Sequence, residues 1–108
     1  MKSTLAILLF LLVGSALAQA PAPVGNAQAA KSKISMCTGC HGIPGYKTVY
    51  PQVYRVPMIT GQQPVYIVNA LQAYKSGARS HPSMRGIARS LSEQDMADLA
   101  AYYSSEPK

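Results

Sequence analysis

The chain has 108 residues, of which 10 are Lys or Arg, 4 are Asp or Glu and 2 are Cys, and its net charge is +6. This length is enough for one small domain, and two cysteines are too few for a disulfide-stapled scaffold. All four carboxylates follow Ser92, so the part of the domain before Ser92 has a basic surface, which attracts acidic partners.

Residues 1–18 have the pattern of a secretory signal peptide. Lys2 gives a basic start, residues 5–13 are apolar, and Ala16-Leu17-Ala18 is a small-x-small cleavage site. The apolar run is shorter than the ~20 residues that a membrane-spanning helix needs. We therefore expect cleavage after Ala18 and a soluble protein in the periplasm, where nucleic acid is not a partner.

The rest of the chain is poor in large apolar residues. Cleavage after Ala18 leaves 90 residues, of which 14 are Leu, Ile or Val and none is Phe. A fraction below roughly 20% is typical of disordered chains, and small domains of this kind usually need a metal, disulfides or another added group to fold. We expect residues 19–26, which are rich in Pro, Ala and Gly, to be a flexible lead-in, and residues 27–108 to form the domain.

The first helix is expected to start at Ala27, with Asn26 as its N-cap and Gly42 as its stop. Its apolar positions recur at helical spacing: Ala27, Ala30, Ile34 and Cys37. This helix would end in the stretch Cys37-Thr38-Gly39-Cys40-His41, which holds both cysteines of the chain.

The order C-x-x-C-H is typical of c-type haem attachment. Two thiols at this spacing can form thioethers to one haem, and the following His41 can ligate its iron. A disulfide-exchange motif would need a βαβ context, and a zinc site would need about four ligands, for which only His81 remains. A plain disulfide between Cys37 and Cys40 stays possible in an oxidising compartment, but it leaves His41 unexplained.

Residues 41–61 contain three prolines and three tyrosines and are expected to form a loop wrapped over an apolar group. The pieces Thr48-Val49-Tyr50 and Val53-Tyr54 have β-propensity, but proline interrupts them. We therefore expect no sheet. Tyr46, Tyr50 and Tyr54 belong to this loop, which could cover the edge of the haem.

Two further helices are predicted. One begins at Gln63-Pro64, with proline at a tolerated position, and ends at Gly77; the other begins at Ser92, which forms a capping box with Asp95. Their buried stripes are Ile67, Ala70, Leu71 and Tyr74 in the first, and Met96, Leu99, Ala100 and Tyr103 in the second, with Leu91 and Met96 at the hydrophobic-staple positions. Residues 78–91 are expected to be a second irregular loop.

The second axial ligand of a haem iron has three candidates. Met84 stands in the expected loop 78–91, from which it could reach the haem face opposite His41, and it is the first choice. His81 is the second choice. Met58 is the third, because its setting beside Pro57 favours packing.

Blocks along residues 26–105 resemble the class I cytochromes c of bacteria, above all the small exported monohaem proteins and each half of their two-haem relatives. The blocks are Cys37–His41, Pro57-x-Ile59-x-Gly61-Gln62, Tyr66, Leu71, Tyr74, Gly77-x-Arg79, Met84, Leu91-Ser92-x-x-Asp95 and Leu99-Ala100-Ala101-Tyr102-Tyr103. The resemblance implies a small all-α fold in which three to four helices wrap one covalent haem c and the terminal helices cross.

The same resemblance implies the roles of individual residues. His41 and Met84 would be the axial ligands, and the Pro57 carbonyl would accept the His41 Nδ1 proton. Ile59 and Tyr66 fall in matching blocks and would line the pocket. Arg79 is the first candidate to neutralise the haem propionates, followed by Arg55 and Lys47.

An iron with both axial positions filled has no open site for a substrate, and no carboxylate stands near the motif to act as acid or base. We therefore expect a monomeric one-electron carrier rather than an enzyme, which docks on redox proteins with acidic faces. Three alternatives remain. The chain could be a subunit of one dehydrogenase or oxidase complex, a haem sensor or peroxidase-like protein if Met84 is labile, or a colourless protein without haem.

Overall fold

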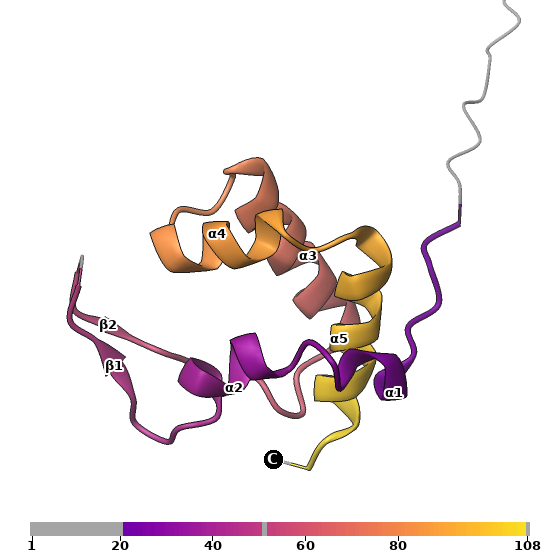
Figure 1. The fold of residues 1–108 in the computed structure, drawn as a ribbon, viewed down its shortest axis with the longest axis horizontal. Coiled ribbons are helices and arrows are strands. Elements are labelled where there is room, and N and C mark those ends of the chain that lie inside the picture. The colour runs from indigo at the N-terminus through magenta and orange to yellow at the C-terminus, as the bar shows by residue number, and fades with distance from the viewer. Residues whose placement is uncertain (1–20, 51, 108) are drawn as a thin grey trace, which may run out of the picture.

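The computed structural model describes residues 21–50 and 52–107, which form five helices and two short strands (Figure 1). The helices are α1 (Ala27–Ala30), α2 (Ser35–His41), α3 (Pro64–Ser76), α4 (Pro82–Arg89) and α5 (Glu93–Ser105), and the strands are β1 (Lys47–Thr48) and β2 (Tyr54–Arg55). The predicted all-α class is confirmed. The predicted signal peptide lies outside the described residues. Within them, no helix is long and apolar enough to cross a membrane.

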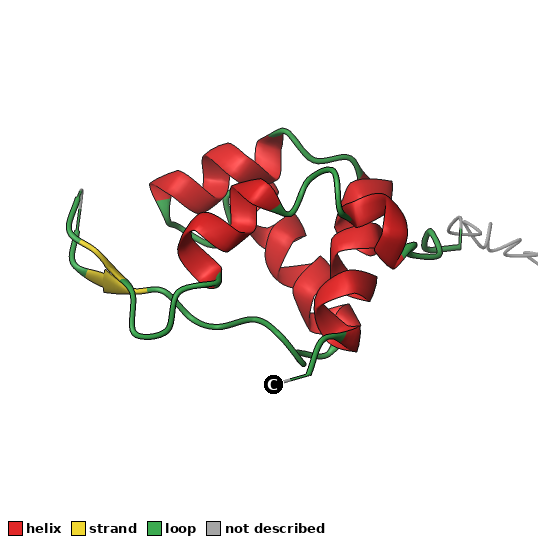
Figure 2. Ribbon diagram, turned by 60° about the horizontal axis from the view of Figure 1, so that its bottom comes forward, coloured by secondary structure: helices red, strands yellow, loops and turns green. Residues whose placement is uncertain are grey.

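The helices pack around α5. It contacts α1 on one side and α3 on the other, and α3 in turn contacts α4. The buried cluster at these contacts is small: Ala30, Ile67, Leu71, Leu91, Met96, Leu99, Ala100 and Tyr103. The five helices form one body, and the β1–β2 hairpin extends from one end of it (Figure 2).

The predicted ends of α3 and the predicted start of α5 are confirmed. Pro64 is the first residue of α3, where its missing N–H costs nothing, and Gly77 ends the helix in the left-handed conformation at φ 90°. At α5, the Ser92 side chain accepts from the Asp95 N–H at 3.1 Å, and the Ser92 N–H donates to Asp95 Oδ2 at 2.9 Å. This reciprocal pair is the capping box.

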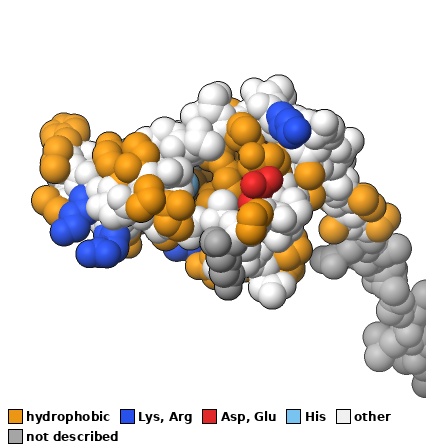
Figure 3. Space-filling view, turned by 90° about the horizontal axis from the view of Figure 1, so that it is seen from below, with side chains coloured by type: hydrophobic (Ala, Val, Ile, Leu, Met, Phe, Trp, Pro, Cys, Tyr) orange, Lys and Arg blue, Asp and Glu red, His pale blue; other side chains and the backbone are white. Residues whose placement is uncertain are grey.

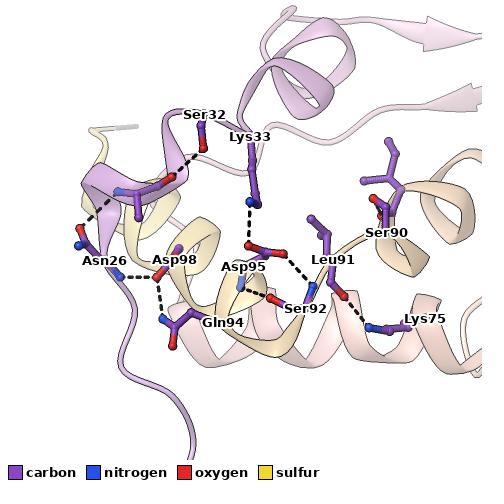
Figure 4. A network of polar contacts seen from close by, with 12 residues as sticks. Asn26, Ser32, Lys33, Lys75, Ser90, Leu91, Ser92, Gln94, Asp95 and Asp98 are labelled. Atoms are coloured by element: carbon purple, nitrogen blue, oxygen red, sulfur yellow. Dashed lines mark hydrogen bonds and ion pairs between the residues drawn. The ribbon is translucent and has the colours of Figure 1, made fainter.

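The segment before α1 is tied to α5 (Figure 4). The Asn26 N–H donates to Asp98 Oδ1 at 2.7 Å, and Gln94 Nε2 donates both to Asp98 Oδ1 and to the Val24 carbonyl, each at 2.8 Å. The Asn26 side chain also caps α1, as predicted. The end of the expected lead-in 19–26 therefore contacts the last helix and places α1 across it.

The single first helix that we expected is wrong, because the chain forms α1 and α2 with a turn between them. Some backbone hydrogen bonds in this region join residues three apart instead of four, as from the Lys33 N–H to the Ala30 carbonyl and from the Cys37 N–H to the Ile34 carbonyl. Such bonds tighten the chain to 3₁₀-like turns, and the Ser32 hydroxyl donates to the Ala29 carbonyl at 3.1 Å. Gly42 ends α2, as predicted for the helix stop.

The irregular loop expected over residues 78–91 is also wrong, because it contains α4. Pro82 occupies the first helical position, and the ring of His81 accepts from the Met84 N–H at 3.5 Å as an unusual N-cap. Ala88 is fully buried, and Met84 and Ile87 pack against the core. The spacing of Met84, Ile87 and Ala88 is helical, so the sequence carried a signal that Gly86 and Pro82 obscured.

The expectation of no sheet is corrected by the two-stranded hairpin. β1 and β2 are antiparallel, with Lys47 opposite Arg55 and Thr48 opposite Tyr54, and the Val56 N–H donates to the Tyr46 carbonyl at 3.0 Å. Each strand has two residues, because the proline-containing sequence around the turn limits the ladder.

Candidate haem-binding cleft

A cleft of about 950 Å³, part of it open to solvent, lies between α2, α3, α4 and the hairpin. Most of its lining is apolar, and a smaller space of about 380 Å³ adjoins it toward α5. Side chains of α2 and α4 line both spaces, and Figure 1 shows these two helices on opposite sides of the gap.

The residues predicted for the site are brought together. Seven of them line the main cleft, namely Cys40, His41, Pro57, Ile59, Tyr66, Arg79 and Met84, while Cys37 lines the adjoining space. Of the other ligand candidates, His81 lines the cleft, whereas Met58 is not among the lining residues and is 49% exposed. Arg55 and Lys47 are not among the lining residues either.

The imidazole of His41 is held by a backbone carbonyl. His41 is the last residue of α2, and its Nδ1 lies 2.6 Å from the Pro57 oxygen. A carbonyl only accepts, so this contact requires the proton on Nδ1. In the neutral ring this places the free lone pair on Nε2, which is the form in which histidine binds a metal.

Met84 and His81 share the first turn of α4. The His81 ring is held from two sides, because it caps the Met84 N–H and packs edge-on against Tyr54 with ring centroids 5.3 Å apart. Met84 is partly buried against the core and lines both spaces. Its thioether therefore belongs to the wall of the cleft, and the ring of His81 supports the backbone beneath it.

The two cysteines are not joined in a disulfide and are half-buried. Cys40 lines the cleft, and Cys37 lines the adjoining space. Burial raises the pKa of the Cys37 thiol, and a contact with the Tyr103 hydroxyl opposes part of that rise. A thiol with a raised pKa is mostly protonated at neutral pH, so Cys37 by itself is a poor metal ligand. Among the described residues, no group of three or more His, Cys, Asp or Glu could hold a metal ion.

The charged groups near the cleft are basic. No Asp or Glu is among its lining residues, and the Arg79 guanidinium lies 4.7 Å from the centre of the Tyr74 ring. Arg79 can therefore meet an acidic substituent of a bound group while its own face is covered by an aromatic ring.

The lining fits a haem. An apolar cleft suits a large planar macrocycle, and one thiol lines the cleft while the other lines the adjoining space. An imidazole nitrogen and a thioether sulfur are available as ligands. The buried Tyr103 hydroxyl, which has no hydrogen-bond partner in the structure, also indicates a missing neighbour. Sequence reasoning missed Thr48 and Val56 as lining residues, whereas Tyr54, which it placed in a loop over the haem edge, does line the cleft. The alternation of Tyr54 and Val56 was a strand signal that the prolines led us to discount.

These features define a c-type haem protein, and comparison with known proteins agrees. The model of the family "Cytochrome c" matches residues 25–105. The chain therefore belongs to the cytochrome c family. It is an electron carrier with one haem c, bound covalently through Cys37 and Cys40.

The relatives include both small and two-domain proteins. The chain is 38% identical to cytochrome c-554(548) of Halomonas halodenitrificans, over 76% of this chain and 98% of that protein. It is 40% identical to cytochrome c4 of Thiocapsa roseopersicina, over 83% of this chain but 45% of that one. The crystal structure of reduced cytochrome c4 from Pseudomonas stutzeri matches with a TM-score of 0.62 and 33% identity, over 78% of this chain and 47% of that one. The chain thus spans about half the length of the cytochromes c4.

Proposed function

We propose that this protein is a freely diffusing one-electron carrier whose haem iron is held by His41 and Met84. The observation that supports it most strongly is the 2.6 Å contact of His41 Nδ1 with the Pro57 carbonyl, because it leaves Nε2 free beside Met84 in one cleft. When bound, the haem supplies an iron that alternates between Fe(III) and Fe(II). A thioether ligand favours Fe(II) and raises the reduction potential.

Each part of the chain contributes to this function. Pro57 keeps the His41 proton on Nδ1 and fixes the direction of the ring. The apolar side chains around Met84 exclude water, which reduces the reorganisation that accompanies a change of charge. The absence of carboxylates among the lining residues supports a carrier that catalyses no reaction of its own.

The ligand assignment can be tested with the far-red charge-transfer band that an Fe(III)–thioether bond gives in the oxidised holo-protein. We expect Met84→Ala to lose the band. Met58→Ala is the matched control, since Met58 is 49% exposed and outside the cleft lining, and it should keep the band. A native protein without the band, or loss of the band in Met58→Ala alone, would overturn the assignment.

We further propose that the carrier docks on acidic faces of its redox partners through the hairpin. Directly opposed residues share one face of an antiparallel ladder, and successive residues alternate between faces. Thr48 and Tyr54 line the cleft, so the opposed Lys47 and Arg55 belong to the outer face.

The hairpin combines these two cations with exposed apolar side chains. Val49 is 80% and Val53 is 72% exposed, and Figure 3 shows basic and hydrophobic side chains together at the hairpin end of the molecule. Like charges directly opposite each other are unfavourable in a sheet, and residues 19–92 contain no carboxylate to offset them. A carboxylate-rich partner would offset them, and the valines would supply an apolar centre to the interface.

Export to the periplasm, with cleavage after Ala18, is proposed from the pattern of residues 1–18. The intact mass of the holo-protein recovered from the periplasm should correspond to a chain that starts at Gln19 and carries one haem.

A further inference from the structure

The hydroxyl of Tyr103 is a buried polar group that the fold itself leaves unpaired. The Tyr103 side chain is 4% exposed, and its oxygen has no hydrogen-bond partner in the structure. Buried tyrosine hydroxyls normally have a partner, because burial without one loses the hydrogen bonds made to water. A hydroxyl buried in such a place therefore calls for an acceptor close to it.

Tyr103 reaches the haem cleft from α5. It lines the adjoining space together with Cys37, His41 and Met84, in a lining that is otherwise mainly aliphatic. The ring is fixed there, since Tyr102 packs edge-on against it with centroids 5.1 Å apart and an interplanar angle of 90°. The direction of the hydroxyl is thus set by packing.

The possible acceptors in this space are few. The His41 ring is engaged at Nδ1 by Pro57, and its Nε2 and the Met84 sulfur are the groups proposed to face the iron. The sulfurs of Met36 and Cys37 remain. Met36 is 38% exposed, whereas Cys37 packs against the buried cluster that contains Tyr103, so the Cys37 sulfur is the acceptor that fits the buried hydroxyl. The contact already affects both groups, because Cys37 contributes to a raised pKa of Tyr103 after the larger effect of burial.

We propose that Tyr103 is a positioning residue for the haem, whose hydroxyl donates a hydrogen bond to the Cys37 sulfur once that sulfur is a thioether of the haem. A thioether has no proton of its own to donate and is a weak acceptor, so attachment settles the direction of the bond. The inference rests on covalent haem attachment, and it adds a residue beyond the ligands of the iron.

The proposed hydrogen bond should affect the reduction potential of the haem. A hydroxyl that donates to the haem-bound sulfur would turn its positive end toward that sulfur, which would favour the more electron-rich reduced state of the haem. In the apolar surroundings of Tyr103 this dipole is weakly screened. Tyr103 should therefore raise the reduction potential of the holo-protein.

The test compares Tyr103→Phe with Tyr102→Phe in the holo-protein. Both changes remove one hydroxyl and keep the aromatic pair, but Tyr102 is half-buried and does not line the space. We expect a lower midpoint potential in Tyr103→Phe and the wild-type potential in Tyr102→Phe. A wild-type potential in Tyr103→Phe, or an equal shift in both variants, would overturn the proposal.

If Tyr103→Phe does not accumulate as holo-protein, a second measurement tests the hydrogen bond in the wild-type protein. Proton NMR of the reduced wild-type protein should show a slowly exchanging hydroxyl proton of Tyr103 close to the β protons of Cys37. Its absence would contradict the hydrogen bond. The far-red band of the Met84 experiment does not depend on Tyr103, so failure of this proposal is distinguishable from failure of the ligand assignment.

Discussion

The close approach of the chain before α1 to α5 depends on one glycine, Gly25. A Cβ added to Gly25 would collide with the Ala97 carbonyl oxygen and would lie 2.9 Å from the Ala101 Cβ. The first of these is a backbone atom of α5, which cannot rotate away. Glycine at position 25 thus lets Asn26 reach Asp98 and lets α1 cross α5 at close range.

Replacement of Gly25 tests this contact. Gly25→Ala should destabilise the holo-protein by about 1–3 kcal/mol, as overpacking does, and should lower the midpoint of urea unfolding. Gly86→Ala in α4 is the matched control, because a Cβ there would meet nothing within 4 Å and alanine is a better helix former by up to ~1 kcal/mol. Equal midpoints for the two variants would show that the crossing does not depend on glycine.

Helix α5 contacts both α1 and α3, and charge interactions of Asp95 stabilise its first turn. The N–H of Ser92 and the ammonium of Lys33, which lies 3.0 Å from Asp95 Oδ1, lower the pKa of Asp95 from 3.8 to about 2 (Figure 4). A lowered pKa in the folded state means that the charged carboxylate stabilises the fold. This contribution is complete above the ordinary pKa of about 4 and is lost as the pH falls through about 2.

Asp95→Asn should therefore reduce the free energy of unfolding at pH 7 by about 1 kcal/mol, the usual effect of losing a cap. The difference from wild type should shrink between pH 4 and pH 2, as measured by urea unfolding at each pH. Glu93→Gln, in the same turn but without these contacts, serves as the control. A difference that stays constant down to pH 2 would contradict the assigned cause.

The hairpin is the element assigned to partner docking. Lys47→Glu combined with Arg55→Glu should slow oxidation of the reduced protein by ferricyanide, an anionic oxidant, at low ionic strength, with the difference fading at high salt. Lys31→Glu combined with Arg89→Glu changes the net charge equally, at two exposed residues outside the hairpin. If both double variants slow the reaction to the same degree, net charge rather than the hairpin governs the encounter.

The elements that the sequence predicted well carry local signals. Pro64 and Gly77 mark the ends of α3, and Ser92 with Asp95 marks the start of α5. Helix α4 was missed because its cap is a histidine and because Pro82 and Gly86 obscured the helical spacing of its apolar residues. Its packing on α3 is not a local feature of the sequence. The hairpin was missed because strands of two residues are too short to show an alternating pattern in the sequence.

The C-x-x-C-H motif and the later sequence blocks predicted the residues that meet in the cleft. Nothing in the sequence indicated that the Tyr103 hydroxyl would be buried without a hydrogen-bond partner.

The protein as a whole has fewer large apolar side chains than an ordinary domain of its size. Three fully buried large side chains, Leu91, Met96 and Leu99, lie where α5 meets its neighbours, and the other side of the helical body is the open apolar cleft. The chain has only 14 large aliphatic residues after Ala18, and this shortage of apolar side chains accounts for the open cleft. The haem completes the core, so the group that carries the electron also stabilises the fold.

The proposed function requires that side chains of this protein fill both axial positions of the iron. The most direct test is to add carbon monoxide to the reduced holo-protein and to record its visible spectrum, because carbon monoxide binds ferrous haem only where a position is open. We predict no spectral change for the wild type and a carbon monoxide adduct for Met84→Ala, which serves as the positive control. Rapid formation of the adduct by the wild-type protein would contradict a closed iron and favour a sensor or peroxidase-like role.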